Sequence, residues 1–114
     1  MPPSGYSKNQ SELIVGFLIS CSDLLIQEAK EQSISPITAL QKEISNIKLC
    51  LENNNSQFQS IILNLTKLFY EKLLANKPKD FQDLKIIREN ICNSFSIEIS
   101  QIHVPSNFKK KLIG

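Results

Sequence analysis

This chain of 114 residues has an ordinary composition for a globular protein: 41% of its residues are hydrophobic and 21% are charged. That apolar content is too high for an intrinsically disordered chain, and the length suits one domain with a single core. The formal net charge of +2 identifies no class of partner. One histidine and three cysteines without a CxxC pair leave few of the residues that catalysis or metal binding requires.

The first predicted element is a helix over residues 8–32. Residues 1–6 contain two prolines and a glycine, so this segment is predicted to be irregular. Ser7 with Gln10 three positions later is a capping-box pattern, which is typical of a helix start. Apolar residues then recur at steps of three and four and predict one face that points into a core. This face consists of Ile14, Phe17, Leu18, Cys21, Leu24 and Leu25.

Two further helices are predicted over residues 36–53 and 57–76. Ser35 and Ser56 are typical N-cap residues, and Pro36 suits the first helical position, where its missing N–H group breaks no hydrogen bond. Each helix has an apolar face at helical spacing, which predicts packing against a shared core. In the second helix this face follows a heptad pattern of Ile37, Leu40, Ile44, Ile47 and Leu51.

The fourth predicted helix covers residues 81–103, with Asp80 as its N-cap and Pro105 after its end. Apolar and polar residues alternate over 95–100, a pattern that is also typical of a strand. We favour a helix because the sequence offers no second strand, and a lone strand would leave its backbone groups unpaired. His103, at the end of this helix, is expected to interact favourably with the helix C-terminus.

Short connections join the predicted helices and place successive helices antiparallel. The sequence therefore predicts an all-α, single-domain antiparallel four-helix bundle over residues 1–114, with an irregular N-terminal segment and a basic C-terminal tail. No stretch approaches the ~20 apolar residues of a membrane span. Residues 18–21 have the form of a lipoprotein cleavage box but lack the other parts of a signal peptide. We expect a cytoplasmic chain without membrane contact, in which Cys21, Cys50 and Cys92 are buried free thiols.

The sequence offers no recognisable catalytic, cofactor-binding or metal-binding site. A zinc or iron site requires three or four convergent ligands, and His103 with dispersed cysteines does not supply them. Glycine-rich phosphate loops and the motifs GxSxG and HExxH do not occur in the sequence. We therefore expect a non-enzymatic protein without a cofactor. The alternative is an enzyme whose pocket is assembled from Asp, Glu, Tyr or Lys residues without a motif.

Two of the predicted helices carry a second apolar row in addition to the core-facing one. One apolar face per helix is enough in a monomeric bundle, so a second face favours burial against a partner. The expected function is therefore a protein-interaction module, a small subunit or adaptor that binds another protein or a second copy of itself. The alternative is that these rows are also buried within the chain. The rows are Val15, Ile19 and Ile26 on the first helix and Leu63, Tyr70 and Leu74 on the third, with Ile86 and Ile97 as a weaker row on the fourth.

Charge is distributed unevenly along the chain. Residues 1–56 contain four lysines and six acidic residues, a net charge of −2, whereas residues 57–114 contain nine basic and five acidic residues, a net charge of +4. The alternative function is therefore a structural subunit of a nucleoprotein complex, which binds phosphates without reading base sequence. Such binding would weaken steeply with salt. The candidate nucleic-acid contacts are Lys77, Lys79, Lys85, Arg88, Lys109, Lys110 and Lys111.

Overall fold

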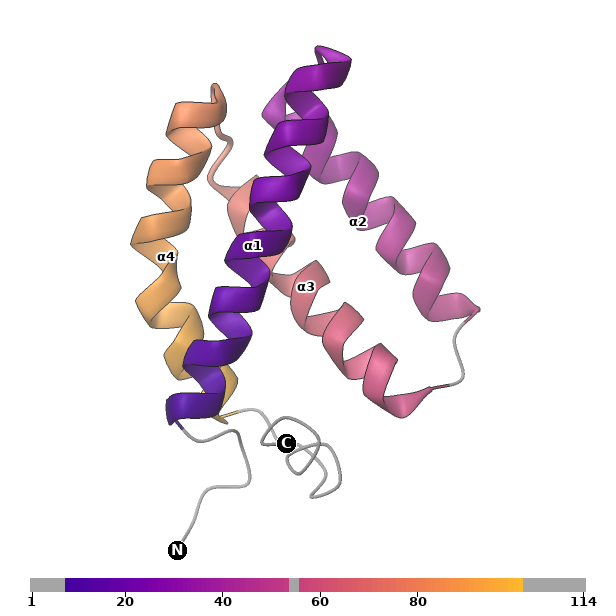
Figure 1. Ribbon diagram of the computed structural model, residues 1–114, viewed down its shortest axis with the longest axis vertical. Coiled ribbons are helices and arrows are strands. Elements are labelled where there is room, and N and C mark those ends of the chain that lie inside the picture. Colours follow the sequence, from indigo (N-terminus) through magenta and orange to yellow (C-terminus); the bar gives the residue numbers. More distant parts are fainter. Residues whose placement is uncertain (1–7, 54–55, 102–114) are drawn as a thin grey trace, which may run out of the picture.

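The computed structural model describes residues 8–53 and 56–101, and these residues form four consecutive helices without a strand (Figure 1). The predicted all-α bundle is confirmed, and the segment over 95–100 is helical. Ser7, residues 102–103 and the tail with Lys109, Lys110 and Lys111 lie outside the described residues. The helices are α1 (Lys8–Gln32), α2 (Pro36–Glu52), α3 (Gln57–Ala75) and α4 (Phe81–Gln101).

Local hydrogen bonds start three of these helices where the sequence predicts them. The Ser35 hydroxyl accepts a hydrogen bond from the backbone N–H three residues later at 3.2 Å, and Ser56 does the same at 3.3 Å. A carboxylate oxygen of Asp80 accepts a backbone N–H in the same way at 2.7 Å. Pro36 is the first residue of α2. Capping therefore fixes the starts of α2, α3 and α4 by interactions within a single turn.

Two helices end at a residue with left-handed backbone geometry. Ser33 follows α1 with φ of 57°, and Lys77 follows the C-cap of α3 with φ of 49°. After Ser33, the N–H group of Ile34 donates to the carbonyl of Ala29 at 3.0 Å, which closes the last turn of α1. Both positions reverse the chain without a glycine, so they carry backbone strain.

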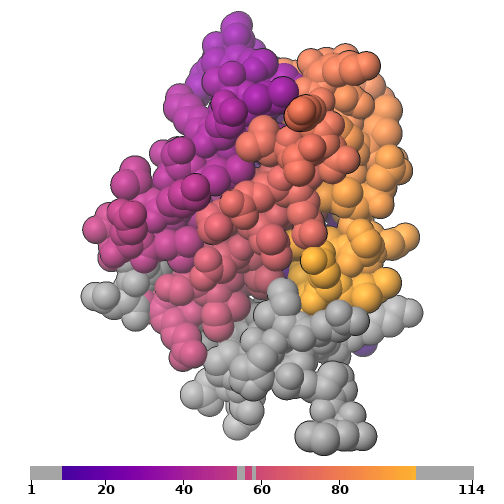
Figure 2. All heavy atoms as spheres, turned by 180° about the vertical axis from the view of Figure 1, so that it is seen from behind, coloured from indigo at the N-terminus to yellow at the C-terminus, as the bar shows by residue number. Residues whose placement is uncertain are grey.

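The helices associate as two pairs. The most extensive contacts join α2 to α3 and α1 to α4, and smaller contacts join α1 to α2 and α3 to α4. Successive helices run in opposite directions, and the α2–α3 pair leans across the α1–α4 pair (Figure 1). Figure 2 shows the opposite side, where α2, α3 and α4 are packed together and α1 is largely hidden behind them. The inclination of the two pairs brings the beginning of α3 away from α1.

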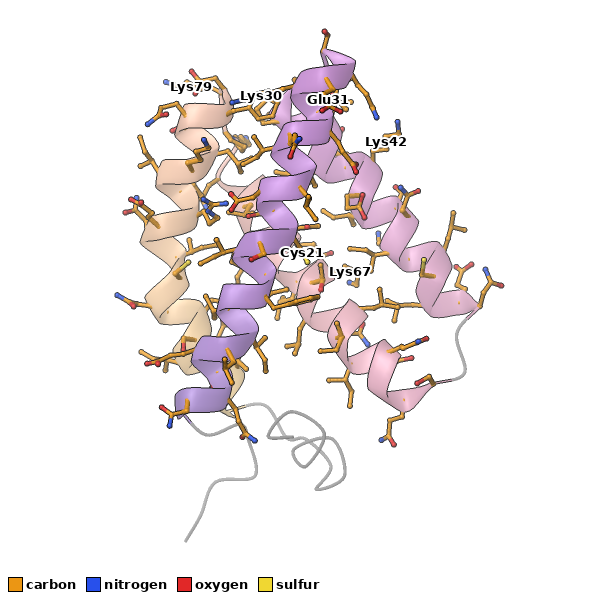
Figure 3. All side chains as sticks on the ribbon, viewed as in Figure 1. Cys21, Lys30, Glu31, Lys42, Lys67 and Lys79 are labelled. Carbon is orange, nitrogen blue, oxygen red and sulfur yellow. The ribbon has the colours of Figure 1, made fainter. Side chains whose placement is uncertain are left out.

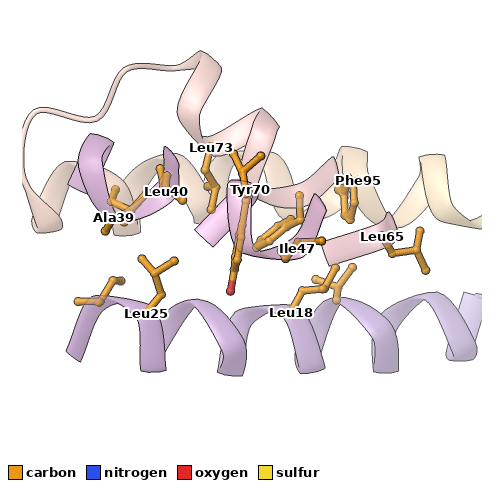
Figure 4. Packing of buried hydrophobic residues seen from close by; sticks show 14 of the residues in the cluster. Leu18, Leu25, Ala39, Leu40, Ile47, Leu65, Tyr70, Leu73 and Phe95 are labelled. Carbon is orange, nitrogen blue, oxygen red and sulfur yellow. The ribbon is translucent and has the colours of Figure 1, made fainter. Parts of the chain in front are cut away.

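One continuous cluster of buried apolar side chains holds the two pairs together. Phe69 of α3 and Phe95 of α4 lie at its centre, with ring centroids 5.2 Å apart and planes tilted by 49°. Leu18, Leu40 and Leu73 are also fully buried there (Figure 4). The core therefore draws side chains from all four helices.

The structure corrects the predicted inward face of α1. Phe17 and Leu24, expected in the core, are exposed, whereas Val15 and Ile26 are buried. Apolar residues surround α1 on most sides, so several faces satisfy the helical spacing and the sequence pattern cannot choose among them. The packing of α1 against α4 decides the orientation instead.

Candidate protein-docking surface

The side chains predicted as an exposed interface are largely covered by the chain itself. Val15, Ile26 and Tyr70 are buried, and the expected exposed row is therefore corrected at these positions. The other three predicted residues, Ile19, Leu63 and Leu74, are partly buried and pack against the core. The physical reason is that α1 and α3 each contact two neighbouring helices, so each buries two faces within the chain.

A different row of apolar side chains is exposed on α1. Leu13, Phe17 and Leu24 have exposed fractions of 65%, 51% and 61%. Their spacing of four and seven residues places them on one helix face, over a length of about 16 Å. We call these three residues the α1 row. The sequence contains this spacing, but the prediction assigned Phe17 and Leu24 to the core.

Beside the α1 row, a groove of about 300 Å³ lies between α1, α2 and α3. We call it the three-helix groove. Phe17 and Leu24 line its α1 side, so the row and the groove form one continuous apolar surface. The remaining lining residues are Cys21, Leu25 and Glu28 from α1, Glu43 and Ile47 from α2, and Ile62, Leu63, Thr66 and Tyr70 from α3.

A second hollow of about 250 Å³ continues along the boundary between α1 and α2. Leu25, Glu28 and Glu43 line both hollows, so the two are neighbours that share a border. The second hollow is more polar, because Gln32, Asn46 and Lys42 also line it. The side chains of this protein therefore do not completely fill the space between α1 and the α2–α3 pair.

The acidic groups of the groove are distributed around a buried phenol. Burial raises the pKa of Tyr70 well above its usual value, and Cys21, Glu43 and Glu28 raise it further. Burial, together with Glu43, also raises the pKa of the Cys21 thiol. Both groups are therefore neutral at pH 7. A neutral thiol is a poor nucleophile.

Three observations restrict the chemistry of the described residues. No group of three or more His, Cys, Asp and Glu side chains among them is placed to hold a metal ion. Burial raises the pKa of Cys92, although Arg88 opposes this effect. None of the described helices is long and apolar enough to cross a membrane.

Arg88 belongs to an interhelical contact and is corrected as a nucleic-acid candidate. Its Nη1 atom donates to Asp23 Oδ1 at 2.6 Å and to the Ser22 hydroxyl at 2.7 Å, with the Ile19 carbonyl at 3.5 Å. Only 13% of the Arg88 side chain is exposed. The guanidinium group therefore connects α4 to α1 and is not presented to a phosphate.

The other basic side chains are dispersed. Figure 3 shows Lys30, Lys42 and Lys67 on three different helices and Lys79 beside the start of α4. Two further candidates, Lys77 and Lys85, lie on either side of Lys79 along the chain, and none of these three candidates makes an ion pair within 8–53 and 56–101. Two acidic residues of the same turn, Asp80 and Asp83, reduce the local positive charge.

Comparison with known proteins gives no match to a family model, a curated sequence or a solved structure. A functional proposal for this chain therefore rests on its own residues, and the α1 row with the three-helix groove is the surface that these residues single out.

Proposed function

We propose that this chain is a non-enzymatic helical interaction module, a small subunit or adaptor that binds a protein partner through the α1 row and the three-helix groove. The observation that carries this proposal is the exposure of Leu13, Phe17 and Leu24 in one row. Single exposed apolar residues are common on protein surfaces, whereas a row that continues into an apolar groove is typical of a binding site.

The size of the surface is consistent with docking that uses both parts. Complete burial of a large apolar side chain contributes about 1.5–3 kcal/mol. Because the three side chains of the α1 row are already partly covered, their further burial supplies on the order of 3–5 kcal/mol. Association costs about 4–15 kcal/mol in lost translational and rotational freedom. The row alone is therefore marginal, and partner side chains that fill the groove are needed for a stable complex.

The proposal is tested by capture of the tagged chain from the cells that naturally produce it, with nuclease and high salt. We expect a stoichiometric protein partner with the natural sequence and its loss with Phe17→Ser/Leu24→Ser. The matched control is Ile86→Ser/Ile97→Ser, which changes two exposed isoleucines on α4. Circular dichroism and thermal melting establish that both variants fold.

Retention of the partner by the Phe17→Ser/Leu24→Ser variant would contradict the proposal. If the chain is captured without a partner, analytical sedimentation at several concentrations measures whether it associates with itself. Self-association that the same variant abolishes would identify a second copy as the partner, and a monomer at every concentration would contradict docking through this row.

A second candidate function is a structural subunit of a nucleoprotein complex. Lys77, Lys79 and Lys85 favour it, because they make no ion pair within the part of the chain that the structure describes. Binding through these lysines would weaken steeply with salt, whereas apolar docking responds little to salt. Partners that disappear on nuclease treatment would therefore favour this candidate.

A further inference from the structure

The three-helix groove contains a buried hydroxyl group without a hydrogen-bond partner. Only 3% of Tyr70 is exposed, and its hydroxyl group points towards α1 (Figure 4). Tyr70 lines the groove, and its hydroxyl makes no hydrogen bond with any described residue. Buried polar groups are nearly always hydrogen-bonded, so the Tyr70 hydroxyl is left to bond either a water molecule or a polar group of a docked partner.

Two carboxylates converge on the same region from different helices. Glu28 of α1 and Glu43 of α2 both line the groove, and both act electrostatically on Tyr70. Neither forms an ion pair among residues 8–53 and 56–101. Lys42 lines the adjoining hollow and forms no ion pair in those ranges either. Two carboxylates against one ammonium group leave a negative charge beside the apolar lining.

The two carboxylates and the phenol favour one class of chemical group on a docked partner. A lysine ammonium or arginine guanidinium group carries several N–H donors, which carboxylates and a phenol oxygen can accept together. An anion is excluded by repulsion from Glu28 and Glu43. Of the other lining residues only Thr66 has a hydroxyl group, and this group donates to the Ile62 carbonyl. The segment that carries the cation must therefore also present apolar side chains to Ile47, Ile62 and Leu63.

From this arrangement we propose that the partner docks as an amphipathic helix with one lysine or arginine among its apolar residues, and that Glu28, Glu43 and the Tyr70 hydroxyl bind this cation. The proposal rests on the proposed function and specifies its partner. The α1 row extends over about 16 Å, the length of roughly three helical turns, which suits a helix that lies along α1. Apolar side chains of that helix would then enter the groove at spacings of three and four residues.

The test uses a displayed library of helical peptides of about 14 residues, roughly four turns, with one face randomised. The library is selected against the full chain. We expect the enriched peptides to carry Leu, Ile or Phe together with a lysine or arginine at a fixed position. The enriched peptide, once synthesised, should bind the Glu28→Gln/Glu43→Gln variant about tenfold more weakly, because charge-assisted hydrogen bonds are lost.

Two further variants distinguish the cation site from general effects. Glu12→Gln/Glu52→Gln also removes one carboxylate from α1 and one from α2, outside the groove, and should leave affinity unchanged. Tyr70→Phe should weaken peptide binding several-fold while the free chain stays as stable as before, because its hydroxyl has no partner to lose.

The outcomes separate this inference from the function on which it rests. Peptides that depend on Phe17 and Leu24 but show no preference for a basic residue would overturn the cation site and leave apolar docking intact. Enrichment of acidic residues in the peptides would also overturn the cation site alone. So would a peptide that binds the Glu28→Gln/Glu43→Gln variant as tightly as it binds the natural sequence. Failure to enrich any peptide that depends on Phe17 and Leu24 would overturn both proposals. Self-association of the chain through this face would overturn the helical partner alone, because the docked partner would then be a second copy.

Discussion

The two sides of α1 differ in how completely the chain covers them. Towards α4, Leu18 and Ser22 are buried, and Arg88 joins the helices through Ser22 and Asp23. Towards α2 and α3, two hollows remain, and Phe17 and Leu24 stay exposed beside them. The comparison teaches that the two sides of one helix are packed differently. The α4 side is closed and stabilises the fold, whereas the opposite side leaves apolar side chains exposed beside two hollows.

Side-chain size explains part of this difference. Ser11 and Ser22 are nearly completely buried and share a face of α1 with Leu18. Small side chains allow close approach of a neighbouring helix, and their close packing excludes water from the interface. On the other side the α2–α3 pair leans across α1, and two hollows remain between these helices.

The largest contrast is expected between two phenylalanines. Phe95→Ala removes a fully buried ring that packs on Phe69 and should reduce the free energy of unfolding by about 3–5 kcal/mol. Phe17→Ala removes an exposed ring and should change it by less than about 0.5 kcal/mol. Urea denaturation measures both. A large loss with Phe17→Ala would break the comparison, because Phe17 would then support the fold.

The second expectation concerns the contact between α1 and α4. Arg88→Ala should reduce the free energy of unfolding by about 2 kcal/mol, because the Ser22 hydroxyl and the Asp23 carboxylate lose a charged donor. Asp23→Asn should cost less, roughly 0.5 kcal/mol, since 57% of the Asp23 side chain is exposed. Equal losses in urea denaturation would show that the exposed ion pair, rather than the buried guanidinium, stabilises this side.

Alkaline pH should destabilise the folded chain through Tyr70 and Cys21, the two groups of the groove that are neutral at pH 7. The pKa values of Tyr70 and Cys21 are raised in the folded chain, so the unfolded chain loses these protons first as pH rises. Stability from this source is complete at neutral pH and declines as pH rises above the ordinary values of 9.0 for cysteine and 10.0 for tyrosine. Thermal melting of Tyr70→Phe should show a smaller alkaline decline, and an identical decline would contradict the burial of this phenol.

A gain in stability is expected at Gly16, an exposed residue within α1. A methyl group added there meets no atom within 4 Å, so Gly16→Ala should gain up to about 1 kcal/mol from helix propensity alone. Thermal melting measures the gain. A loss of stability would show that the surface beside the α1 row is more closely packed than the structure describes.

Features of this molecule that depend on local sequence are easier to predict than features that depend on packing between helices. Ser35, Ser56 and Asp80 fix helix starts through hydrogen bonds within one turn, and these starts follow directly from the sequence. The buried face of α1 does not, because apolar residues occur around most of its circumference. The bond between Arg88 and Ser22 spans 66 positions in the chain, so its existence depends on how α4 packs against α1.

The sequence predicts the apolar character of the candidate site but not the residues that form it. A surplus of apolar residues on α1 and α3 predicts an apolar docking surface, and this expectation stays a prediction. The members of that surface depend on how the helices pack, since Phe17 and Leu24 are exposed in the structure and Tyr70 is buried. Glu28 and Glu43 line the groove from two different helices, and no sequence motif marks such a pair.

The most direct test of the proposed docking surface is hydroxyl-radical footprinting of the chain alone and of the chain bound to the partner that capture from its native cells identifies. Oxidation of individual side chains reports their exposure, and the chain contains its own reference in Ile86 and Ile97 on α4. We expect Leu13, Phe17 and Leu24 to become protected in the complex while these two isoleucines react as before. Protection of the isoleucines with an unchanged α1 row would contradict the account.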